Sequence, residues 1–167
     1  MIRGALGSIA KSALGLLDHK LVFEGIKGTG TGGQARGWES RVLLYMAPGD
    51  QDYLLATILH ELGHIVDYEA GPRGAYCYWS TGCLPYENSP WVASVPSWQD
   101  AVTYNGLTSG YVRDYSTRNV AEDFADTFMW RIYNSNSEIP YPSNFNIPNQ
   151  ERQDTLTVAL SQFMRIR

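Results

Sequence analysis

The sequence predicts an α+β fold in which a short mixed sheet is combined with amphipathic helices. Two stretches before residue 47 are rich in β-branched, aromatic and aliphatic residues, whereas later segments carry apolar residues at helical spacing. The 167 residues contain neither an internal repeat nor a low-complexity linker. We therefore expect a single domain over residues 1–167, which is long enough to bury a sizeable core.

The short elements are assigned in chain order. An amphipathic helix is expected over residues 8–17 and a strand over residues 21–26. Residues 28–33 are expected to form a flexible glycine-rich loop. No Gly-Lys-Ser/Thr follows these glycines, which argues against a phosphate-binding loop. A second strand is expected over residues 38–46, and a final packing helix near residues 154–166.

The longest predicted helix covers residues 51–70. Asp50 before it is the expected N-cap, and Gly71-Pro72 after it is the expected stop. Its apolar residues recur at helical spacing and are Leu54, Leu55, Ile58, Leu59, Leu62, Ile65 and Val66. They gather on one side of the helix, so this side is expected to pack into the core and the opposite side to carry a site.

That opposite side carries His60-Glu61-Leu62-Gly63-His64, which is the H-E-x-x-H pattern. Positions i and i+4 share a helix face, so both histidines can hold one Zn²⁺ while Glu61 reaches a water bound to the metal. Asp67 lies on the same side. The competing interpretation, that these are surface histidines or satisfied core histidines, would place two imidazoles and two carboxylates on one stripe by accident.

A third metal ligand has to be a carboxylate, because the only other histidine lies in the N-terminal segment. A metzincin-type site is excluded, since it needs Gly and His where this chain has Asp67 and Ala70. The best source is a second amphipathic helix over residues 119–133, in which Glu122 and Asp126 share one face. We expect Glu122 to bind the metal and Asp126 to accept the other ring N–H of a ligating histidine.

Two alternatives at Glu122 stay open. Asn119-x-x-Glu122 has the spacing of a capping box, in which Glu122 would only bond back to the helix N-terminus. Asp123 can also be the ligand, with Glu122 in solvent. Glu122 is favoured because two histidines and one glutamate are an established catalytic zinc set.

With these residues the chain resembles the lethal-factor-like zinc metalloproteases, the family of the anthrax toxin lethal factor catalytic domain and the small secreted Pro-Pro endopeptidases. The resemblance rests on His60-Glu-Leu-Gly-His-Ile-Val-Asp-Tyr-Glu-Ala-Gly71, and on Tyr115 followed by Asn-Val-Ala-Glu122-Asp-Phe-Ala-Asp126. It covers residues 20–133 in the order of elements and is sharp at residues 60–71 and 115–126. The flanks depart freely.

The resemblance implies a zincin-like fold and a gluzincin site, in which two histidines and a later glutamate bind zinc. It makes Glu61 the general base and Tyr115, seven residues before Glu122, the group that stabilises the oxyanion. It also matches Asp126 and Asp67 to acids of the family. The implied activity is a zinc-dependent endopeptidase with a protein or peptide substrate, whose cleavage preference does not transfer. Apart from the resemblance, Tyr115 is one of eleven tyrosines and can be a surface or core residue.

Two other functions stay open. A non-catalytic zinc-stabilised protein-binding module would not need Glu61 and would usually have a fourth protein ligand in place of water. A zinc hydrolase acting on a substrate other than a peptide would share the whole site, and only substrate profiling separates it from an endopeptidase.

Elements flanking the motif helix are expected to hold the substrate. In related zinc proteases an edge strand near the site pairs with the extended substrate, and the strand over residues 38–46 is the candidate unless it is an ordinary core strand. Residues 72–114 are rich in Gly, Pro, Ser, Tyr and Trp and are expected to border the cleft. Trp91, Trp98 and Tyr104 either line substrate pockets or only cover the core.

Composition and charge argue against several other classes of protein. The chain is 44% hydrophobic and 13% aromatic, so it is not disordered as a whole, and its net charge of −4 does not favour nucleic-acid binding. No apolar run reaches the length of about 18 residues that predicts a transmembrane segment. We expect a monomer and a secreted location, although residues 1–11 do not form a convincing signal peptide. Cys77 and Cys83 either close a small disulfide or stay reduced.

Overall fold

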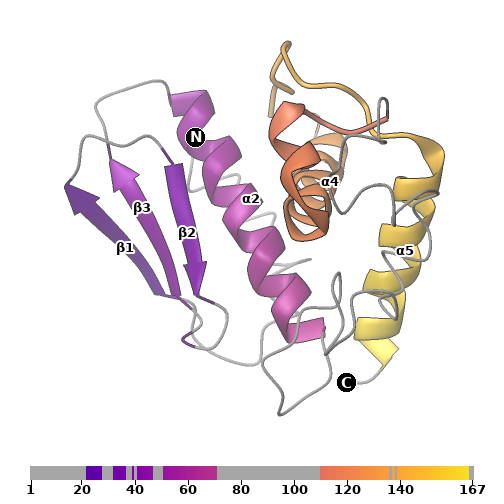
Figure 1. The fold of residues 1–167 in the computed structure, drawn as a ribbon, viewed down its shortest axis with the longest axis horizontal. Coiled ribbons are helices and arrows are strands. Elements are labelled where there is room, and N and C mark those ends of the chain that lie inside the picture. Colours follow the sequence, from indigo (N-terminus) through magenta and orange to yellow (C-terminus); the bar gives the residue numbers. More distant parts are fainter. Residues whose placement is uncertain are drawn as a thin grey trace.

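The computed structural model describes residues 22–27, 32–36, 39, 41–46, 51–70, 110–135, 137 and 139–165. This part of the chain is α+β, with a small mixed sheet packed against helices, as the sequence predicts (Figure 1). Several predicted features lie outside the described residues. They are the helix over 8–17, the Asp50 cap, the Gly71-Pro72 stop, Cys77 and Cys83, and the aromatic residues Trp91, Trp98 and Tyr104.

The sheet contains β1 (Val22–Lys27), β2 (Gly32–Arg36) and β3 (Arg41–Met46) in the spatial order β1-β3-β2. β1 pairs with β3 in parallel and β2 pairs with β3 in antiparallel. The strand predicted over residues 21–26 exists as β1, shifted by one residue. The strand predicted over residues 38–46 exists as β3, which begins three residues later, at Arg41.

The position of β3 corrects the prediction about the edge strand. β3 lies between the other two strands, and Val42, Leu43 and Leu44 are buried in succession, which requires cover on both faces. Within the described sheet, β2 is an edge strand, although its first residues were expected to belong to a flexible loop. Gly32 and Gly33 have low strand propensity, so only tertiary pairing with Tyr45 and Leu44 makes them a strand.

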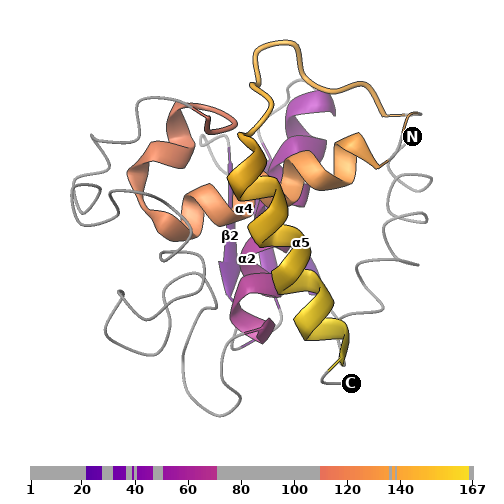
Figure 2. The same ribbon diagram turned by 90° about the vertical axis from the view of Figure 1, so that its right-hand side faces the viewer.

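The helices stack in layers away from the sheet, in the order α2 (Gln51–Ala70), α4 (Val120–Asn134) and α5 (Gln150–Arg165) (Figure 1). Figure 2 shows the same stack from the α5 side, with α5 in front of α4. The 3-10 helix η5 (Asp114–Arg118) leads directly into α4. In the described part of the chain, no helix combines the length and apolar character required to cross a membrane.

The helix boundaries follow local capping. α2 has the predicted bounds, and α4 begins after Asn119, whose side chain accepts a hydrogen bond from the Glu122 amide at 3.0 Å. α5 begins at Gln150, earlier than the predicted residue 154. Its early start is explained by Asn149, whose side chain accepts a hydrogen bond from the Arg152 amide at 3.1 Å.

The motif helix α2 is buried on more than its apolar side. It lies between the sheet and α4, so the described core contains its residues Leu55, Ala56, Ile58, Leu59, Leu62, Ile65 and Val66. The polar side is buried as well, because only 4% of His60 and 5% of Glu61 is exposed. Both the core face and the site face of α2 are therefore largely covered by other elements, although 13% of the His64 side chain stays exposed.

Gly63 sets the distance between α2 and α4. A Cβ atom on Gly63 would lie 2.7 Å from the Cα atom of Ala125 and 2.9 Å from its carbonyl oxygen. No real side chain fits at such a distance, so the two backbones touch at this crossing. The histidines of α2 and the acids of α4 are consequently held within reach of one another.

Candidate metal centre

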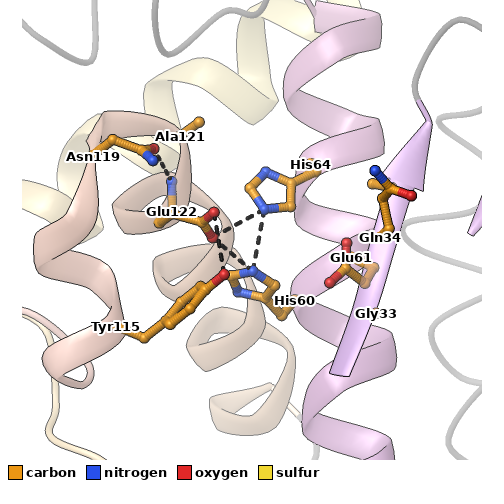
Figure 3. A pocket seen from close by; sticks show the side chains of 10 residues that line it. Gly33, Gln34, His60, Glu61, His64, Tyr115, Asn119, Ala121 and Glu122 are labelled. Carbon is orange, nitrogen blue, oxygen red and sulfur yellow. Dashed lines mark hydrogen bonds and ion pairs between the residues drawn. The ribbon is translucent and has the colours of Figure 1, made fainter. Parts of the chain in front are cut away.

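Three side chains from two helices meet at one point. His60 and His64 come from α2, Glu122 comes from α4, and Figure 3 shows their polar atoms directed at one another. The His60 Nε2 atom lies 2.9 Å from Glu122 Oε2 and 3.1 Å from His64 Nε2, and His64 Nε2 lies 3.2 Å from the same Glu122 oxygen. These three residues form a group that can bind a metal ion.

The donor set and its spacing fit a tetrahedral metal. Zinc forms bonds of about 2.0–2.2 Å to histidine nitrogen and carboxylate oxygen, so neighbouring ligand atoms of a tetrahedral site lie about 3.3 Å apart. The observed separations of 2.9, 3.1 and 3.2 Å are close to this value. Two imidazoles and a carboxylate also suit a borderline cation such as Zn²⁺ better than a cation that prefers only oxygen ligands.

The structure separates the roles of the adjacent acids Glu122 and Asp123. Asn119 caps α4 with its own side chain, and the Glu122 carboxylate is directed at the histidines. Asp123 is fully buried on another side of α4, where Arg152 Nε donates to both of its oxygens at 2.9 Å. Of the two candidate carboxylates, only Glu122 therefore lies at the histidine cluster.

Asp126 contacts the ring nitrogen of His60 that faces away from this cluster. His60 Nδ1 lies 2.7 Å from Asp126 Oδ1, and since a carboxylate only accepts, Nδ1 donates the hydrogen bond. Burial alone lowers the pKa of His60, but its hydrogen bonds with Asp126 and Glu122 outweigh burial and raise that pKa to about 9. This arrangement matches the carboxylate–histidine pair that orients metal ligands in proteins.

The carboxylates of the site remain ionised for the complementary reason. Burial raises the pKa of Glu122, but hydrogen bonds from His60 and His64 outweigh it and hold that pKa well below its usual range. The pKa of Asp126 is lowered in the same way by His60 and Arg113 against the effect of burial. A fixed negative charge therefore lies on each side of His60.

Glu61 occupies the space between α2 and β2 (Figure 3). A Cβ atom on Gly33 would lie 2.5 Å from Glu61 Cγ, so glycine at this position lets β2 approach the Glu61 side chain without displacing it. Burial raises the pKa of Glu61, while the two histidines and a backbone hydrogen bond with Ala35 partly oppose the shift. The result is a carboxylate beside the metal-binding group whose proton affinity is higher than that of an exposed glutamate.

Tyr115 approaches the cluster from η5. Its hydroxyl donates to Glu122 Oε1 at 3.5 Å, and its ring stands edge-on to His60 with the ring centroids 5.6 Å apart. The Arg118 guanidinium lies over the same ring, 4.3 Å from its centroid. Burial, followed by the charge of Glu122, raises the pKa of Tyr115, so its hydroxyl is protonated at neutral pH and can act as a donor.

Arg113 and Ser116 also belong to the site, although no sequence pattern predicts them. Arg113 donates two hydrogen bonds to Asp126 Oδ1, at 3.0 Å from Nε and 2.7 Å from Nη2, and Ser116 donates to Oδ2 at 2.7 Å. No local pattern signals them, because they lie outside the helix that carries their partner. Asp67 is fully buried on α2, and its predicted role beside the site stays a prediction.

A cavity of about 410 Å³ opens in front of these groups. β2 lines one side and the start of α4 lines the other, and the His60, Glu61, His64 and Tyr115 side chains border it. The remaining lining residues are small or polar, and they are Gly33, Gln34, Ala35, Asn119, Ala121 and Glu122. This volume lies within the range of about 300–1,000 Å³ that is usual for small-molecule binding sites.

Comparisons with models of known protein families, with curated proteins and with solved structures give no match to this chain. The geometry of the centre is therefore the basis for a functional assignment. It establishes a His60-His64-Glu122 group able to bind a metal ion, with a buried carboxylate and a tyrosine hydroxyl beside it.

Proposed function

We propose that this protein is a zinc-dependent endopeptidase with a zincin-like fold. The observation that carries the proposal is the buried Glu61 carboxylate beside a His60-His64-Glu122 group, at the wall of an open cavity. A purely structural zinc site does not need a carboxylate such as Glu61 beside its ligands, so this residue favours a catalytic site over a zinc-stabilised binding module.

The chemistry follows from the positions of the side chains. When bound, zinc would supply a Lewis acid and lower the pKa of water to about 7. Glu61 would accept the proton of the attacking water and then deliver it to the leaving amine, for which its raised pKa is suited. The Tyr115 hydroxyl would donate a hydrogen bond to the oxygen that becomes negative as water adds to the scissile carbonyl.

The substrate would bind as an added strand along β2. An extended peptide can pair with an exposed strand edge through main-chain hydrogen bonds, largely independently of its side chains. Gly33, Gln34 and Ala35 line the cavity and belong to this strand, so a peptide added to it would lie next to Glu61. The candidate substrate strand is therefore β2, in place of the strand that the sequence indicated.

The decisive experiment compares the wild type, Glu61→Gln and chelator-treated protein on a peptide library, with products identified by mass spectrometry. Glu151→Gln on the exposed side of α5 is the matched control. We expect one zinc per chain in the wild type and in both variants. Of the two variants only Glu61→Gln should lose cleavage, by about 10²–10⁴-fold, because a general base contributes a factor of this order. The chelator-treated protein should lose cleavage as well, because the metal that activates water is removed. Cleavage by Glu61→Gln at the wild-type rate would refute the proposal, as would a wild type that binds no zinc.

A further inference from the structure

Arg113 joins two parts of the site that lie on different elements. It lies directly before η5, with four-fifths of its side chain buried, since 19% is exposed. Its Nε donates to both Asp126 oxygens at 3.0 and 2.9 Å, and its Nη2 donates to Oδ1 at 2.7 Å. The fully buried Asp126 is therefore held by a guanidinium that contacts both of its oxygens.

Asp126 has no orientational freedom left in this arrangement. Oδ1 accepts from His60 and Arg113, and Oδ2 accepts from Ser116 and Arg113. Arg113 Nη2 also approaches His60 Nδ1 to 3.2 Å, but both atoms are donors here, so this is a close contact. Asp126 is thus oriented by Arg113 and Ser116 and in turn orients the imidazole of His60.

The second attachment of Arg113 is to the segment of Tyr115. The Arg113 guanidinium lies 5.1 Å from the centroid of the Tyr115 ring, and the Arg113 carbonyl accepts from the Ser116 amide at 2.9 Å. The Arg113 amide also donates to Ser116 Oγ at 3.3 Å. The start of η5 is therefore tied to Asp126 by the same two side chains that fix this carboxylate.

We propose that Arg113 is a positioning residue that couples the orientation of His60 to the placement of Tyr115. Loss of its guanidinium frees the Asp126 carboxylate to rotate, which weakens the metal site, and it frees the start of η5, which displaces the Tyr115 hydroxyl. The second effect rests on the proposed function, whereas the first requires only that the site binds zinc. Arginine is required because the ammonium group of a lysine cannot contact both carboxylate oxygens in one plane.

The test uses Arg113→Met, Arg113→Lys and Ser116→Ala in the full chain. The control is Arg152→Lys, which weakens the other buried arginine–aspartate pair of α4, on a side of the helix away from the histidines. Zinc affinity is measured by competition with a chromophoric chelator, and stability is measured by urea unfolding. The values of kcat and KM are measured on a cleaved peptide at saturating zinc.

We expect Arg113→Met to bind zinc about 10–100-fold more weakly. A loss of this size is typical when the carboxylate that orients a metal-binding histidine is disturbed, and Arg113 holds that carboxylate. Arg113→Lys and Ser116→Ala should lie between Arg113→Met and the wild type. At saturating zinc, kcat should fall in Arg113→Met while KM changes little. Arg152→Lys should lose stability without a change in zinc affinity.

Wild-type zinc affinity in both Arg113 variants would overturn the inference, and so would an equal weakening in Arg152→Lys, which would indicate a general effect of stability. If the wild type binds zinc but cleaves no peptide, the endopeptidase proposal fails and the zinc affinities still decide the role of Arg113. If the wild type binds no zinc, the positioning role fails together with the proposed function.

Discussion

Gly63→Ala tests whether the contact between α2 and α4 sets the geometry of the metal-binding group. The added Cβ atom would lie 2.7 Å from Ala125 Cα and 2.9 Å from its carbonyl oxygen. Carbon atoms pack at about 3.5–4.0 Å, so the backbones must separate by about 1 Å at the crossing. The neighbouring atoms belong to the backbone of α4, and no side-chain rotation can relieve the contact.

A shift of this size is large for a metal site, where ligand distances hold to within about 0.2 Å. We expect Gly63→Ala to lose about 1–3 kcal/mol of unfolding free energy through overpacking. Its zinc affinity should fall at least about tenfold, which corresponds to about 1.4 kcal/mol. Urea unfolding of the metal-free protein measures the first quantity, and chelator competition measures the second.

Leu156→Ala is the matched control for loss of stability. Leu156 is buried on α5, and removing its side chain should cost about 2–5 kcal/mol of unfolding free energy. Because α5 contributes no ligand, the zinc affinity of the folded control should stay at the wild-type value. A folded Gly63→Ala protein with wild-type zinc affinity would show that the helix crossing does not set the ligand distances.

Three further predictions concern the proposed base, the proposed oxyanion donor and pH. Tyr115→Phe should lower kcat by about 10²–10³-fold with little change in KM, since one transition-state hydrogen bond is lost; steady-state kinetics with an unchanged kcat would exclude this role. Gly33→Val should displace Glu61, because its Cβ would lie 2.5 Å from Glu61 Cγ, so we expect loss of turnover with one zinc per chain retained, measured by metal analysis beside the peptide assay. In the metal-free protein the raised pKa of His60 contributes stability that is complete below 6.5 and is lost as pH rises through about 9. The lowered pKa of Glu122 contributes stability that is present above 4.5 and is lost at lower pH. Thermal midpoints of the metal-free protein should therefore be highest between pH 4.5 and 6.5, and a midpoint that rises from pH 6.5 to 9 would contradict this account.

The parts of the fold that the sequence predicts are those controlled by local patterns. α2 and α4 have helical periodicity over many residues, and the Asn119 cap marks the start of α4. The spacing of four residues within each helix placed His60 near His64 and Glu122 near Asp126. Which face of α4 meets α2 is a tertiary property, and it was inferred from the donor chemistry of zinc.

The errors arose where pairing between distant segments decides the structure. β2 has glycines at its start and little strand propensity, so its pairing with β3 cannot be read from residues 32–36. The position of β3 directly before α2 in the chain predicts that it lies beside the site, whereas the sheet inserts it between β1 and β2. Arg113 precedes Asp126 by thirteen residues, without a periodic pattern that connects them.

The close contact between Gly33 and Glu61 has a consequence for the choice of the scissile bond. A peptide added to β2 would run about 4.8 Å from it, at the usual strand spacing. Pairing with the sheet would therefore fix the distance between the peptide backbone and Glu61. Sliding the peptide by one residue reverses the faces of all its side chains, but sliding it by two restores them. Secondary cleavage products should therefore differ from the main product by two residues, with the intermediate bond left intact.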